Sequence, residues 1–249
     1  MPAIMFLVLL IAIELPYRFL KGKTGPAALS DYAINGIQAG LITLSAFVLG
    51  LSFAQASDRF DARRALVVKE ANAIGTTWLR AEQLPSPDAK LFRRTLTQYT
   101  AERLEAYQTP LKEQAVDATI QRSLSYQDSL WAIVSSALRK HPNDLGLSLL
   151  METLNDTIDV SAEQLQALTN HVPTAMFVLT LSLVILSAFA TGVRFAHSGE
   201  RPAIMTTLLV LAYVVVIGMN VDYDLPQKGV IKVNLEPMRI QLQSMKDAG

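Results

Sequence analysis

The residues able to carry out chemistry are few and are scattered along the 249-residue chain. The three histidines, His141, His171 and His197, lie far apart, and no two have the spacing of a metal site on a helix. The absence of cysteine excludes disulfides, thiolate metal sites and cysteine nucleophiles. The glycine-rich phosphate loop, the dinucleotide fingerprint and the nucleophile elbow are also missing. We therefore predict that the protein is not an enzyme and holds no metal or cofactor.

The densest group of charges directly follows an apolar stretch and consists of Asp58, Arg59, Asp61, Arg63 and Arg64. Such charges can pair along a helix at i+3 and i+4 and anchor it where a membrane meets water. In an oligomer, the same charges would surround a pore mouth and concentrate ions. Both interpretations stay open. We expect Arg59 to lie at the membrane boundary with a carboxylate partner from Asp58, Asp61 or a neighbouring subunit.

The composition is that of a membrane protein with a polar part. Hydrophobic residues make up 51% of the chain and charged residues 18%, below the roughly 25% of an ordinary soluble domain. The 22 basic and 22 acidic residues cancel, so no global positive field exists to bind nucleic acid. Most of the charges lie between residues 57 and 172. The lipid bilayer is therefore an expected partner, and nucleic acid is not.

Four stretches reach the length of about 20 apolar residues that a membrane-spanning helix needs. They cover residues 1–20, 33–56, 172–195 and 203–221. The first contains Glu14 and Pro16, and a cleaved signal peptide is its alternative. The domains predicted from this pattern are spans one and two (1–56), an extramembrane domain (57–172), a transmembrane hairpin (173–221) and a polar tail (222–249).

The second span has two distinct stripes. Its polar residues Asn35, Gln38, Ser45 and Ser52 share one helical face, while Gly36 and Gly40 form a small-xxx-small pair on another. Polar side chains in a membrane helix must face protein or water. They therefore pack against other helices or line a pore, and in neither case does this helix face lipid all round.

The polar middle lacks the turns of a β domain, and prolines divide it into helical segments. We expect breaks near Pro85 and Pro87, near Pro110 and near Pro142, and an N-cap at Asn143 or Asp144. The proline-free run 57–84 should continue the second span as one long helix. An amphipathic stripe is formed by Phe92, Leu96, Tyr99, Arg103 and Tyr107.

In the tail, residues 229–233 alternate like a short strand, and 236–245 could form a last helix. The predicted fold class is all-α: a polytopic membrane protein with four transmembrane helices and a helical extramembrane bundle between the second and third.

Two motifs carry a family resemblance. The segment 45–50 (Ser-Ala-Phe-Val-Leu-Gly), followed by Asp58-Arg59-Phe60 and Asn72, resembles the second span of bestrophins. The segments 59–64 and 70–76 are similar to the bacterial bestrophin-like membrane proteins, and this similarity extends over most of the chain.

The resemblance implies a homo-oligomeric ion channel, pentameric, in the inner membrane, with inorganic ions as its cargo. It places an apolar neck on the second span, which carried over to this chain is Thr43, Phe47 and Leu51; Thr43 departs from the usual aliphatic residue. The polar stripe would then be an interhelical contact. The alternative is a non-conducting scaffold or sensor whose helical domain binds a partner.

The orientation of the chain receives conflicting signals. The resemblance implies that residues 57–172 lie in the cytoplasm, and Arg59, Arg63, Arg64 and Lys69 agree with it. Arg18, Lys21 and Lys23 after the first span, and the loop from Arg194 to Arg201, favour the opposite side.

Overall fold

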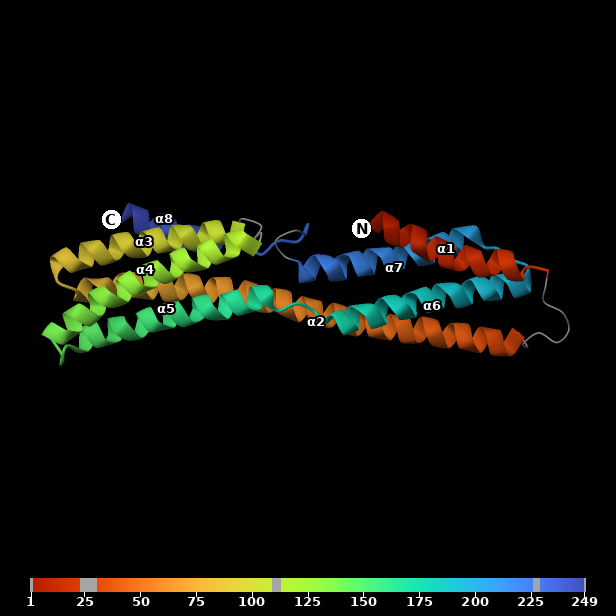
Figure 1. Ribbon diagram of the computed structural model, residues 1–249, viewed down its shortest axis with the longest axis horizontal. Helices are drawn as coiled ribbons and strands as arrows, with labels where there is room; N and C mark the ends of the chain where they lie inside the picture. The colour runs from red at the N-terminus through yellow and green to blue at the C-terminus, as the bar shows by residue number, and fades with distance from the viewer. Residues whose placement is uncertain (1, 23–30, 109–112, 226–228, 249) are drawn as a thin grey trace. The chain divides into compact units, whose positions relative to one another are not determined.

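The computed structural model describes residues 2–22, 31–108, 113–225 and 229–248. The fold is all-α, with 89% helix and no strand among the described residues (Figure 1). The elements are α1 (Pro2–Leu20), α2 (Asp31–Arg80), the 3₁₀ turn η1 (Ala81–Gln83), α3 (Ser86–Gln108), α4 (Glu113–Lys140), α5 (Leu145–Thr169), α6 (Thr174–Ser198), α7 (Ala203–Asp224) and α8 (Glu236–Asp247).

Two compact units make up the chain. The membrane unit consists of residues 1–59 and 171–225, and the helical unit consists of residues 60–170 and 226–249. The helix α2 begins in the first and ends in the second, as its lack of proline predicts. The last helix, α8, belongs to the helical unit, where it packs on α3.

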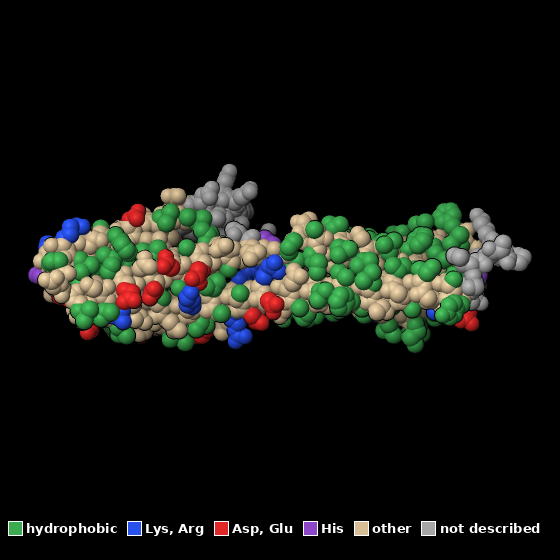
Figure 2. Space-filling model, turned by 90° about the horizontal axis from the view of Figure 1, so that it is seen from below, with side chains coloured by type: hydrophobic (Ala, Val, Ile, Leu, Met, Phe, Trp, Pro, Cys, Tyr) green, Lys and Arg blue, Asp and Glu red, His purple; other side chains and the backbone are tan. Residues whose placement is uncertain are grey.

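In the part of the chain that the structure describes, four helices are long and apolar enough to cross a membrane: α1, α2, α6 and α7. Figure 2 shows the contrast between the units on one face, since apolar side chains cover the membrane unit while most acidic and basic side chains lie over the helical unit. The fold class predicted from the sequence is therefore confirmed.

In the membrane unit, α1 packs closely on α6 and also contacts α7. Gly192 on α6 makes this close approach possible, because a Cβ there would lie 2.1 Å from the Ile13 carbonyl oxygen and 2.5 Å from Pro16 Cγ. At the end of α1, Glu14 accepts from Arg18 at 2.8 Å and from Arg201 at 2.6 Å. These contacts join α1 to the loop before α7.

The helical unit has its own apolar core. The apolar stripe of α3 predicted from its spacing is buried here, with Phe92, Leu96 and Tyr99 fully covered. Side chains from four other helices complete the core: Ile74 of α2, Leu130 and Val134 of α4, Leu150 and Leu154 of α5, and Met238 and Met245 of α8.

The helix ends fall where the local sequence places them. Pro85 precedes α3, and α4 ends at Lys140 just before Pro142. Asp144 caps α5 by accepting a hydrogen bond from the Leu147 amide at 3.0 Å. Pro110 lies outside the described residues.

The short strand predicted at residues 229–233 is wrong. Residues 229–231 form bends, and no strand is present among the described residues to pair with them. A strand needs a neighbouring strand to pair with, and the bodies of the surrounding helices use their backbone groups in their own i to i−4 hydrogen bonds. Val233 and Leu235 pack instead against the apolar core of the helical unit.

Candidate functional site

The polar stripe of α2 faces other helices of the membrane unit. Gln38 Nε2 donates to Thr191 Oγ1 at 3.1 Å, and the hydroxyls of Ser45 and Tyr213 lie 2.8 Å apart. Ser187 Oγ lies 3.1 Å from Ser45 Oγ. These bonds satisfy polar groups in an apolar environment and join α2 to α6 and α7.

The other packing residues proposed from the sequence lie in two settings. Ser52 is buried, whereas Asn35 is exposed at the edge of the stripe, beside a pocket that Arg194 and His197 also line. Gly36 and Gly40 are exposed, and a Cβ built on either would have open space around it. Among the described residues, therefore, the two glycines make no close helix contact.

The opposite face of α2 carries the candidate neck. Thr43 is exposed, and Phe47 and Leu51 are 63% and 43% exposed. A spacing of four residues drifts by only about 40° per step, so the three side chains share one face over two turns. This face turns away from the helices that α2 contacts and is available to another molecule.

Arg59 does not pair with the acids expected from its neighbourhood. Its Nη1 donates to the Gln55 carbonyl at 3.3 Å, and its buried Nε has no acceptor in the described part of the chain. Asp58 and Asp61 are exposed. The expected pairing within the chain is wrong because residues one and two apart point to different sides of a helix. A partner from a neighbouring subunit stays a prediction.

The two remaining arginines of the charged segment differ sharply. Arg64 is exposed, whereas Arg63 is only 1% exposed. Arg63 donates from Nε to the Ala167 carbonyl at 3.0 Å and from Nη2 to the Asn170 carbonyl at 2.9 Å. These carbonyls end α5, where the helix dipole favours a cation. Arg63 therefore ties α2 to the end of α5.

A buried charged cluster in the helical unit was not predicted. Glu70 of α2 is fully buried and accepts from Arg103 Nε at 2.6 Å and from Arg103 Nη2 at 3.3 Å. Tyr107 donates to the same carboxylate. The available signal was Arg103 itself, because an arginine on an otherwise apolar stripe needs a buried partner. Its partner could not be chosen without knowing that α2 and α3 meet there.

Burial sets the protonation of this cluster. Burial raises the pKa of the Tyr107 hydroxyl, and the neighbouring Glu70 carboxylate raises it further, so Tyr107 stays a hydrogen-bond donor. Burial alone would lower the pKa of Arg103, but Glu70 outweighs it and moves the pKa upward. Glu70 and Arg103 therefore form a hydrogen-bonded ion pair inside the helical unit.

A family model of the bestrophin-like domain matches residues 3–238, nearly the whole chain. The chain belongs to the bestrophin-like family. Solved structures agree with the fold of this bestrophin-like chain. It is similar to a variant of a bacterial bestrophin homologue from Klebsiella pneumoniae with a TM-score of 0.71 and 16% identity, over 99% of this chain and 96% of that one.

A second structure of the Klebsiella pneumoniae homologue, solved by Zn-SAD phasing, matches with a TM-score of 0.68 and 17% identity over the same shares of the two chains. At such identities the similarity establishes the fold of the bestrophin-like chain. No curated protein matches it.

Proposed function

We propose that this protein is a homo-oligomeric membrane ion channel, pentameric, with a neck formed by Thr43, Phe47 and Leu51 of α2. Bestrophins are ion channels, and family membership is the first support for the proposal. The observation that carries it is the exposed face of α2. On that face two large apolar side chains stand among small residues, opposite the polar side chains that pack on α6 and α7.

The chemistry of this face fits a symmetry axis better than a lipid surface. Gly36, Gly40 and Gly50 have open space around them, and small residues let helices approach closely. Lipid chains offer no comparable reason for several glycines on one face. With α2 from each subunit around an axis, Phe47 and Leu51 form successive apolar rings. A narrow apolar collar of this kind gates ions by dewetting.

Replacing both Phe47 and Leu51 with alanine should raise ion flux through reconstituted liposomes, because the collar widens and holds water more readily. The matched control is Phe189→Ala with Leu186→Ala on α6. These residues are the same types and similarly exposed, but lie on a different helix. The control pair should leave flux unchanged.

The alternatives predict other patterns in the same liposomes. Gln38→Ala should weaken assembly, because it removes a bond between α2 and α6. If Gln38→Ala changed the ion flux while Phe47→Ala and Leu51→Ala changed only the assembly of the oligomer, the proposed neck would be wrong. Intact oligomers with no flux in any variant would favour a scaffold or sensor whose helical domain binds a partner.

We further propose that the helical unit lies in the cytoplasm of a cell whose inner membrane holds the channel. Arg18 and Arg201, which favour the opposite orientation, share the carboxylate of Glu14, but the positive-inside rule counts basic residues and not net charge, so this pairing does not cancel their signal. Lys69 likewise pairs with Glu163 at 2.7 Å, so the orientation rests mainly on the family.

Cysteine labelling tests the orientation cleanly, because the chain has no cysteine of its own. Ser129→Cys lies on an exposed position of α4, and Ser198→Cys lies exposed at the end of α6. In intact cells, a membrane-impermeant maleimide should label Ser198→Cys and leave Ser129→Cys unlabelled until the membrane is opened. Labelling of Ser129→Cys alone would reverse the orientation.

A further inference from the structure

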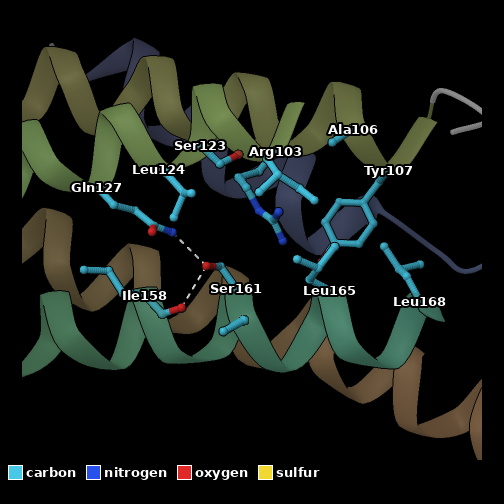
Figure 3. A pocket seen from close by; sticks show the side chains of 12 residues that line it. Arg103, Ala106, Tyr107, Ser123, Leu124, Gln127, Ile158, Ser161, Leu165 and Leu168 are labelled. Carbon is cyan, nitrogen blue, oxygen red and sulfur yellow. Dashed lines mark hydrogen bonds between the residues drawn. The ribbon is translucent and has the colours of Figure 1, made fainter. Parts of the chain in front are cut away.

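A cavity of about 180 Å³ lies within the helical unit among α3, α4 and α5. Most of its wall is aliphatic: Ala106, Ile120, Leu124, Ile158, Leu165 and Leu168. Figure 3 shows Arg103 and Tyr107 entering from α3, and Ser123, Leu124 and Gln127 from α4, above the side chains of α5. The cavity lies outside the face of α2 that carries the proposed neck.

One buried polar group of the wall, the hydroxyl of Ser123, has unused hydrogen-bonding capacity. Ser123 is only 6% exposed, and its hydroxyl has no partner among the described residues. Buried hydroxyls in folded proteins almost always have a partner, so an unpaired one in a cavity wall is available to a bound water or to a polar group of a ligand. Arg103 donates from Nε and from Nη2 to Glu70.

Gln127 and Tyr107 already donate hydrogen bonds to other side chains of the helical unit. Gln127 Nε2 donates to Ser161 Oγ at 2.8 Å and to Tyr99 Oη at 3.3 Å, and the first of these bonds is drawn in Figure 3. Tyr107 donates to Glu70. Since Glu70 neutralises Arg103 and no other base among the described residues lines the cavity, the described wall has no net charge for an anion.

We propose that this cavity binds a small neutral molecule, about the size of a substituted benzene ring, that carries one hydroxyl group. An apolar cavity of about 150 Å³ is large enough to hold benzene. The extra room here and the unpaired hydroxyl of Ser123 accommodate a ligand hydroxyl, while the aliphatic wall binds its apolar body. The proposal is independent of ion conduction and concerns a second site on the protein.

Binding of phenol and benzene to the purified full-length protein tests the proposal. Affinities are measured by titration calorimetry in one detergent, so that partitioning of either probe into micelles is the same for every variant. The wild-type protein should bind phenol about fivefold to tenfold more tightly than benzene, as one net hydrogen bond provides. Benzoate should not bind, because its carboxylate would be buried near Glu70 without a free cation.

The variant Ser123→Ala should bind benzene as before and lose the preference for phenol. Its control is Ser129→Ala on the same helix, whose hydroxyl is exposed and donates to the Ser125 carbonyl at 2.8 Å. Ala106→Leu places extra carbons in the cavity and should abolish the binding of both probes, and its unfolding midpoint without probe shows that it is folded. No saturable binding to the wild type, or a phenol preference that survives Ser123→Ala, would overturn the proposal.

Discussion

Replacing Glu70 with alanine should destabilise the helical unit by about 3–5 kcal/mol, the cost of leaving a buried charge without its partner. Arg103 would lose both of its bonds to the carboxylate, and Tyr107 would lose its acceptor. Both tryptophans, Trp78 and Trp131, lie in the helical unit. Guanidinium unfolding followed by tryptophan fluorescence therefore reports the stability of this unit.

The neighbouring residue provides the control for this measurement. Lys69 pairs with Glu163 at 2.7 Å, but both side chains are about half exposed, so Lys69→Ala should cost no more than about 1 kcal/mol. The double variant Glu70→Leu with Arg103→Met should recover much of the loss, because it removes both buried charges together. If Glu70→Ala and Lys69→Ala lowered the free energy of unfolding by the same amount, the Glu70 carboxylate would not be buried as described.

Replacing Gly192 with valine should disrupt the membrane unit by more than the roughly 1–3 kcal/mol of ordinary overpacking. The new Cβ would lie 2.1 Å from the backbone oxygen of Ile13, and backbone atoms cannot rotate away as a side chain can. Helix α1 must therefore move off α6. Size-exclusion chromatography after heating measures the fraction of protein that stays monodisperse. For Gly192→Val this fraction should fall at a much lower temperature than for the wild-type protein.

Gly218 of α7 is the matched position for Gly192, because a Cβ there would meet open space. Gly218→Val should keep the wild-type thermal midpoint within a small margin. If Gly192→Val and Gly218→Val behaved alike, the close approach between α1 and α6 would not be a determinant of stability.

Features set by neighbouring residues could be predicted from the sequence. The four apolar helices, the continuity of α2 and the cap at Asp144 depend on composition, on the absence of proline and on a short polar side chain at a helix start. The geometry of a helix is local, and this is why the residues proposed for the neck and the polar stripe could be assigned to opposite faces of α2 before their surroundings were known.

Features set by distant residues could not be predicted in the same way. Arg63 was interpreted as part of an interfacial charge group, yet its acceptors are carbonyls of α5, about a hundred residues away in sequence. Every residue has a backbone carbonyl, so the residue type does not indicate which carbonyl accepts a hydrogen bond from an arginine. Glu70 also gave no signal of burial, because its partner lies on another helix. The assignment of Arg59 to Asp58 or Asp61 failed for a local reason, since it ignored helix geometry.

Cysteine accessibility at Thr43 tests the channel proposal most directly. The chain has no cysteine, so Thr43→Cys introduces a single thiol into liposomes that are conducting ions. If Thr43 faces a central water path, a small charged methanethiosulfonate reagent should react there and stop the flux. It should not affect Ser45→Cys, whose position is buried beside Tyr213. Flux blocked through Ser45→Cys but not through Thr43→Cys, or liposomes with intact oligomers and no flux, would contradict the account.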